Sequence, residues 1–368
     1  MSIAQRRHHS IRKLVLAASA AVVALLPGVV HAGATVSVYA TGLNSPRGLT
    51  FGPDGALYVA EGGPGGSNAT TPEQCQQVPP PVGPYTGSPT GGRISRIDAS
   101  GHRTTVIDSF PSSKSNPLVG FLASGVAAVA FIGDTMYAIT AGSGCSHGVP
   151  STTNGVFRID GSSATLVADL SAYLMSHPTA VIDPGDFEPD GTPYSMIAVR
   201  GALYAVEPNH GEIDRITTSG QISRVIDVSA SQGHVVPTAL AYHGNFFLGN
   251  LNTFPQPIGS SKVWQVSPDG TIQLRETGFD MILGIAFDHY DQMYVLETAA
   301  NHPAPAPFAG RVTRVHPNGA REVIADGLMF PTGITTGPDG NLYVSNFGFG
   351  TPPGSGQVVK IDLGNYRH

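Results

Sequence analysis

The chain has 368 residues, of which 12% are charged and 41% hydrophobic, and this balance excludes an intrinsically disordered protein. Its 46 glycines and 30 prolines are typical of an all-β chain with many turns. The formal net charge at pH 7 is −6, and the basic residues are scattered. We therefore expect neither nucleic acid nor an anionic membrane surface as a partner.

The N-terminal 32 residues have the pattern of a secretory signal peptide. Basic residues come first, followed by an apolar stretch and a small cleavage-site residue: Arg6, Arg7, Arg12 and Lys13, then Leu14 to Val30, then Ala32. Cleavage after Ala32 predicts a secreted or periplasmic protein without stable membrane insertion. A retained membrane anchor is the alternative.

Residues 33–368 are predicted to form one domain built from six repeats. Each repeat contains an aliphatic and aromatic strand that ends in an oxygen-bearing side chain. These strands are Leu57–Glu61, Met136–Thr140, Leu203–Glu207, Phe246–Asn250, Met293–Glu297 and Leu342–Asn346. An apolar strand precedes each of them, and in the first and last repeats a Gly-Pro-Asp-Gly turn, at 52–55 and 337–340, joins the two strands.

A third strand follows in every repeat and a fourth in five of them, whereas the sixth repeat lacks its fourth strand. Residues 36–43 precede Pro46 in the same way as residues 322–328 precede Pro331. The N-terminal strand can therefore complete the last repeat and remove the exposed edges. The expected fold is an all-β, six-bladed β-propeller with four-stranded antiparallel blades. A solenoid is the alternative, but it needs no shared termini.

The long insertions all fall on one face of such a propeller. Residues 62–91, 141–154, 298–309 and 347–355 follow second strands, and residues 109–124 and 170–193 precede first strands. This asymmetry predicts that the loop-rich face is the functional one, with neutral variation of loop length as the alternative. Cys75 and Cys145 lie on this face, and in an exported chain such a pair predicts a disulfide rather than two free thiols.

The last residues of the six strands would surround the mouth of the central channel on this face. They are Glu61, Thr140, Glu207, Asn250, Glu297 and Asn346. Carboxylate and amide oxygens without cysteine suit a hard cation, so the pattern predicts one divalent cation, most simply Ca²⁺, held by Glu61, Glu207, Asn250, Glu297 and Asn346. A water-lined channel whose carboxylates stay solvated is the alternative.

Histidines on the same face offer a second chemistry. His210 and His234 come from neighbouring repeats beside Glu207 and Asn250, so they are the candidates for a general acid or base. His147 and His302 share this face. Each histidine taken alone can equally be a polar loop residue.

Several phrases resemble the ScyD/ScyE family of exported propellers, namely residues 38–63 (VYATGLNSPRGLTFGPDGALYVAEGG), 90–98 (TGGRISRID) and 190–216 (DGTPYSMIAVRGALYAVEPNHGEIDRI). This family is similar to the wider class of gluconolactonase-like and streptogramin lyase-like propellers. The resemblance implies the fold. It also implies a channel-mouth cation near Glu61, Asn250 and Asn346, as in gluconolactonases, and a His and Glu pair such as His210 and Glu297, as in the lyases.

Two functions remain open at this point. The first is a binding protein that presents its loop-rich face to a small molecule, a glycan or a protein, and we expect it to be a monomer. The second is a metal-assisted lactonase-like or esterase-like hydrolase, or a lyase, with its site at the channel mouth.

Overall fold

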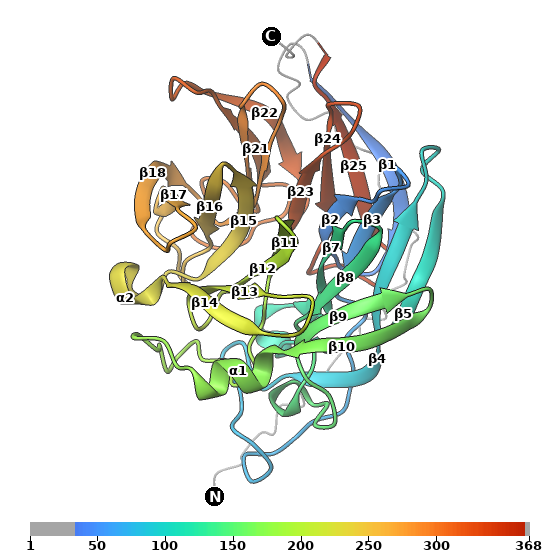
Figure 1. The fold of residues 1–368 in the computed structure, drawn as a ribbon, viewed down its shortest axis with the longest axis vertical. Helices are drawn as coiled ribbons and strands as arrows, with labels where there is room; N and C mark the ends of the chain where they lie inside the picture. Colours follow the sequence, from blue (N-terminus) through green and yellow to red (C-terminus); the bar gives the residue numbers. More distant parts are fainter. Residues whose placement is uncertain (1–33, 365–368) are drawn as a thin grey trace, which may run out of the picture.

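Six antiparallel sheets are arranged around a central channel in the computed structural model, which describes residues 34–364 (Figure 1). Blade 1 contains β2 (Pro46–Phe51), β3 (Leu57–Glu61), β4 (Thr86–Ile97), β5 (Arg103–Lys114) and the short β6 (Ala123–Ser124). Blade 2 contains β7 (Val126–Ile132), β8 (Thr135–Thr140), β9 (Gly155–Asp160) and β10 (Ser163–Asp169). Blade 3 contains β11 (Ser195–Val199), β12 (Ala202–Glu207), β13 (Glu212–Ile216) and β14 (Ile222–Asp227).

The other three blades repeat this order of strands. Blade 4 contains β15 (Pro237–His243), β16 (Asn245–Asn250), β17 (Ser261–Val266) and β18 (Ile272–Phe279). Blade 5 contains β19 (Ile282–Phe287), β20 (Met293–Glu297), β21 (Gly310–Val315) and β22 (Arg321–Leu328). Blade 6 contains β23 (Gly333–Thr336), β24 (Leu342–Asn346), β25 (Gly356–Asp362) and, as its outer strand, β1 (Thr35–Leu43).

Helical segments occur in the connections of the loop-rich face. They are η1 (Pro117–Val119), η2 (Cys145–His147), α1 (Leu170–Ser176) and α2 (Ser229–Gln232). Asp169 caps α1, because its side chain accepts a hydrogen bond from the backbone N–H of Ala172. No helix within residues 34–364 is long and apolar enough to cross a membrane. The predicted signal peptide, residues 1–32, lies outside the described residues.

The predicted Gly-Pro-Asp-Gly turns are present, and their side chains stabilise them. Gly55 and Gly340 have φ values of +76° and +75°, which favour glycine. In the first turn the carboxylate of Asp54 accepts hydrogen bonds from the Ala56 N–H, at 3.1 Å, and the Tyr58 hydroxyl, at 3.1 Å. Asp339 does the same for Asn341 and Tyr343 in blade 6. These contacts fix the corner between the first and second strands.

Pairing of β1 with β25 joins the two ends of the chain, and it follows a register from Thr35 opposite Asp362 to Leu43 opposite Gly356. Each pair of adjacent blades shares its own buried apolar cluster. The cluster between blades 6 and 1 includes Leu43 from β1, together with Leu49, Leu57 and Val358. The first strands of adjacent blades also contact one another all the way around the channel.

Blade 1 differs from the prediction in its third and fourth strands. Residues 86–91 and 109–114 were expected to be loops, but they extend β4 and β5, and Thr86 pairs with Lys114. The extension contains Ser112 and Ser113, which are fully buried and whose hydroxyls are hydrogen-bonded. Because these segments are rich in Pro, Gly and Ser, local β propensity gives no sign of the extra pairs.

The disulfide predicted between Cys75 and Cys145 is present. It joins the loop after β3 to the loop after β8, so it links blades 1 and 2 on the loop-rich face. Thr70 strengthens the same junction, because its hydroxyl donates a hydrogen bond of 2.6 Å to the carbonyl oxygen of Cys145. His147, two residues after Cys145, belongs to the site described below.

Closure by β1 leads to a stability prediction. Leu43 is fully buried between blades 6 and 1, whereas Val38 on the same strand is 39% exposed. We expect Leu43→Ala to lower the free energy of unfolding by about 2–5 kcal/mol, because it leaves a cavity at the blade junction. Val38→Ala is the matched control and should cost about 0.5 kcal/mol. Equal effects of the two variants in urea unfolding would contradict a role for β1 in closing the ring.

Candidate functional site

The acidic and amide side chains at the ends of the second strands bind the backbone of their own blades. Four of them accept a hydrogen bond from an N–H group in the segment that leads into the first strand of the same blade. The pairs are Glu61 with Asn44 at 2.6 Å, Glu207 with Thr192 at 2.8 Å, Glu297 with Asp280 at 2.9 Å, and Asn346 with Met329 at 2.8 Å. Asn250 donates to the carbonyl oxygen of Val235 at 2.9 Å. These side chains hold the loop-rich ends of the blades together.

The remaining contacts of these residues also lie within the blades. Glu61 forms a buried ion pair of 2.6 Å with Arg93, and Glu207 accepts a second hydrogen bond of 2.5 Å from the N–H of His210. Asn250 accepts from the N–H of Lys262 at 2.7 Å. The hydroxyl oxygen of Thr140 accepts a hydrogen bond from the N–H of Gly155, so this side chain also binds the backbone of its own blade.

The expected cation site is therefore not assembled from these residues. Within residues 34–364 there is no group of three or more His, Cys, Asp or Glu side chains that could hold a metal ion. Calcium needs six to eight oxygen ligands around one point, whereas Glu61, Glu207, Asn250, Glu297 and Asn346 each direct their oxygens to their own blade. These five residues do not fit the predicted Ca²⁺ ring, and we derive no chemical step through a cation there.

The two candidate histidines both contact one loop, residues 183–193, which connects blades 2 and 3. His234 places its Nε2 atom 2.8 Å from the carboxylate of Asp186. Burial opposes the charged imidazolium, but the hydrogen bond and charge of Asp186 outweigh it and raise the pKa of His234. His210 is buried, and its Nε2 atom lies 3.3 Å from the carbonyl oxygen of Glu188. The histidines thus support the loop from two neighbouring elements.

A cavity of about 200 Å³ opens at the loop-rich end of the channel. Most of its wall is apolar, and its polar side chains include Arg47, Tyr85, Asp186, Glu188 and Asn209. A larger hollow of about 440 Å³ occupies the channel itself, but it is lined by the first strands and carries no acidic or basic side chain. An apolar cavity with a few converging polar groups is the usual form of a small-molecule site, so the mouth cavity is the stronger candidate.

Glu188 is a buried carboxyl in the wall of this cavity. Its side chain is buried, and its Oε1 atom accepts a hydrogen bond of 2.9 Å from the hydroxyl of Tyr85. Its Oε2 atom has no hydrogen-bond partner among the described residues. Burial, with a further contribution from the charge of Asp186, raises the pKa of Glu188 to about 8. The carboxyl is therefore mostly protonated and neutral at pH 7.

His147 faces Glu188 but does not form an ion pair with it at neutral pH. Its Nε2 atom is 3.7 Å from Oε2 of Glu188, which is too long for a hydrogen bond. Burial lowers the pKa of His147 to about 4, so both groups are neutral between pH 4 and pH 8. The imidazole stacks on the ring of Tyr85, with 4.8 Å between ring centroids, and its Nδ1 atom lies 2.8 Å from the hydroxyl of Ser113.

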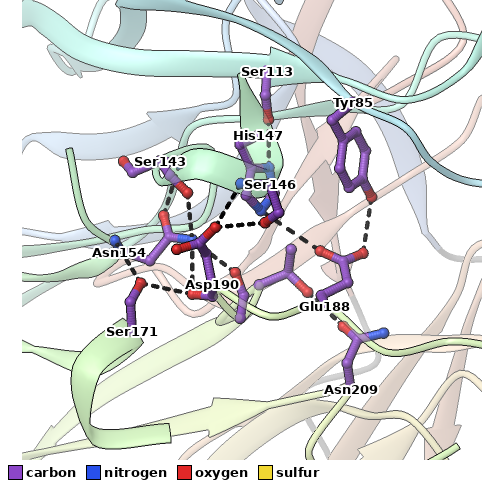
Figure 2. Close-up of polar contacts among 12 residues, drawn as sticks. Tyr85, Ser113, Ser143, Ser146, His147, Asn154, Ser171, Glu188, Asp190 and Asn209 are labelled. Carbon is purple, nitrogen blue, oxygen red and sulfur yellow. Dashed lines mark hydrogen bonds and ion pairs between the residues drawn. The ribbon is translucent and has the colours of Figure 1, made fainter. Parts of the chain in front are cut away.

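Figure 2 shows how the loop that carries Glu188 is fastened to its surroundings. The carboxylate of Asp190 accepts hydrogen bonds from both the N–H and the hydroxyl of Ser146, at 2.7 and 2.6 Å. Asn154 donates to the carbonyl oxygen of Gly191 at 2.7 Å. On the other side, Asn209 donates to the carbonyl oxygen of Asp186 at 2.8 Å. Two connections, the one between β8 and β9 and the one between β12 and β13, therefore determine where Glu188 lies.

Sequence reasoning did not select Arg47, Tyr85, Asp186, Glu188 or Asp190 as site residues. One signal was present, because four acidic residues fall within eight positions of an insertion on the predicted functional face: Asp183, Asp186, Glu188 and Asp190. Tyr85 lies more than 100 positions before Glu188, and only the folded loops bring the two together.

No protein-family model matches this chain, and no curated protein is similar to it in sequence. Several solved structures are similar in fold. A Thermus thermophilus protein assigned as a glucose dehydrogenase has a TM-score of 0.56 and 18% identity over 90% of this chain and 100% of its own. A protein assigned as a gluconolactonase has a TM-score of 0.52 and 12% identity over 90% of this chain and 93% of its own.

A streptogramin B lyase is also similar, with a TM-score of 0.48 and 13% identity over 90% of this chain and 98% of its own. At these identities the likeness shows the fold alone. The likeness to the first two proteins shows the propeller fold that the sequence predicts, while the resemblance to the ScyD/ScyE family stays a prediction.

The neutral state of Glu188 predicts a pH-dependent stability. A glutamate in the unfolded chain has a pKa of about 4.3, whereas Glu188 in the folded protein titrates at about 8. The folded state holds this proton more tightly, so a rise in pH between these values costs the wild type stability. Glu188→Gln cannot ionise and should gain at most about 1.4 kcal/mol per pH unit relative to the wild type in that range. Urea unfolding at pH 4.5, 6 and 8 measures this, and a constant difference would contradict it.

Proposed function

We propose that this chain is an exported binding propeller that holds a small organic molecule in the mouth cavity of its loop-rich face. The cavity itself is the observation that carries this proposal, because it combines apolar walls with a few polar groups on fixed loops. The disulfide between Cys75 and Cys145 agrees with export, since such bonds persist in oxidising compartments.

A metal-assisted hydrolase or lyase has less support from the side-chain contacts. Structural neighbours include proteins assigned as a gluconolactonase and as a glucose dehydrogenase. The oxygens expected to hold a cation are, however, engaged with backbone N–H groups of their own blades. Binding of a small molecule in the mouth cavity needs no such ligand set, so we favour it over a metal-dependent reaction.

Blocking the cavity tests this proposal. Ser124 lines the cavity and is half-buried, so Ser124→Trp should fill it. Leu118 belongs to the same connection but is 84% exposed and does not line the cavity, so Leu118→Trp is the control. In ligand-observed NMR with a library of small organic fragments, we expect hits that Ser124→Trp abolishes and Leu118→Trp retains. A library that yields no such hit would contradict the proposal.

A further inference from the structure

We infer that the mouth cavity is selective for a small organic anion, a carboxylate on an apolar ring or chain, and that Arg47 is its charge partner. This inference rests on the proposed function and names the class of ligand. It follows from the charges that remain uncompensated around the cavity and from the nature of its walls.

Among the described residues that line the cavity, Arg47 is the one cation, and no carboxylate neutralises it. It stands at the start of β2, and its guanidinium donates to the carbonyl oxygen of Ala123 and lies 5.6 Å from the centre of the Tyr194 ring. None of the ion pairs formed by arginines within residues 34–364 includes Arg47. An arginine without a carboxylate in a partly apolar cavity is suited to bind one from a ligand.

The two acidic side chains of the wall do not cancel this charge. Asp186 is paired with His234 at 2.8 Å. The Oε1 atom of Glu188 accepts a hydrogen bond from the hydroxyl of Tyr85. Glu188 is mostly protonated at pH 7, because burial raises its pKa to about 8. Among the described residues that line the cavity, Arg47 is therefore the charged side chain without a partner of opposite charge. The titratable groups around Glu188 are Tyr85, His147, Asp186, Glu207 and His210.

The walls indicate what the anion is attached to. They include apolar side chains from five different connections: Val82, Leu122, Leu251, Phe254, Pro305 and Phe349. Phe254 is 50% exposed although it lines the cavity, and Phe349 stacks on Phe330 with 4.7 Å between ring centroids. Covering such surface with carbon atoms of a ligand contributes about 25 cal/mol per Å². A purely inorganic anion would leave these walls unused.

Glu188 makes this selectivity dependent on pH. Above pH 8 its carboxyl ionises, and the new negative charge offsets that of Arg47. An anion should then bind less tightly, whereas a cation should bind more tightly. Glu188→Gln places a neutral amide where the wild type gains a negative charge, so it should weaken this pH dependence. The part that remains comes from His234, which loses its positive charge beside Asp186 as the pH rises.

Three probes that share one ring distinguish the possible ligands: benzoate, benzyl alcohol and benzyltrimethylammonium. We expect the wild type at pH 6 to bind benzoate about tenfold more tightly than benzyl alcohol, because the carboxylate forms a hydrogen-bonded charge pair with Arg47 that the alcohol cannot form. The ratio should fall at pH 9 in the wild type and should fall less in Glu188→Gln, in which only the pair of His234 and Asp186 changes charge. Arg47→Gln should abolish the preference for benzoate over benzyl alcohol. Arg158 of β9 is half-exposed and does not line the cavity, so Arg158→Gln is the matched control and should keep this preference. Calorimetry or ligand-observed NMR at constant ionic strength measures these affinities.

Two results would overturn the inference: tighter binding of benzyltrimethylammonium than of benzoate, or a benzoate affinity that Arg47→Gln leaves unchanged. In either case the proposed function stands if Ser124→Trp abolishes the binding. If none of the three probes binds in a cavity-dependent way, the inference fails, and the fragment screen with Ser124→Trp decides separately on the proposed function. If Arg47→Gln does not fold, the inference is tested by the pH dependence of benzoate binding to the wild type and to Glu188→Gln. A wild-type affinity for benzoate that does not change between pH 6 and pH 9 contradicts the inference.

Discussion

The antiparallel pairing of β1 with β25 is the contact on which the rest of the structure depends. It supplies blade 6 with its outer strand and places Leu43 in the cluster between blades 6 and 1. With the ring closed, every blade packs on two neighbours and the six first strands surround one channel. The mouth cavity exists only because loops from different blades then meet at one end of that channel.

Burial away from water determines which side chains are charged at the loop-rich end of the channel. Carboxylates that accept backbone hydrogen bonds, such as Glu207, hold the loops in place, whereas Glu188 is buried with one oxygen unbonded and stays protonated. The same burial keeps His147 neutral, so the wall around these two groups carries little charge of its own. Arg47 is then the lining charge without a partner of opposite charge, and the proposed selectivity rests on the neutral state of Glu188.

Much of the fold could be predicted from the sequence, because period, turn residues and shared termini are local or repetitive signals. The strand from Leu57 to Glu61 was predicted with the bounds that it has in the structure, and so was the disulfide between Cys75 and Cys145. The site was predicted less well. Glu61 and its counterparts were placed correctly at the strand ends, but their side chains turn to backbone N–H groups, which strand periodicity does not encode. Glu188 and Tyr85 meet through irregular loops, whose paths depend on tertiary contacts such as those of Asp190 and Asn154.

The protonation state of Glu188 is the central claim, and it can be measured directly. In a ¹³C NMR titration of protein labelled at the glutamate side-chain carboxyls, Glu188→Gln identifies the resonance of Glu188 by its loss. We expect that resonance to titrate with a midpoint near pH 8, because burial and the nearby Asp186 disfavour the carboxylate. A midpoint below pH 5 would show that Glu188 is ionised at neutral pH, and it would contradict both the neutral cavity wall and the preference for an anion.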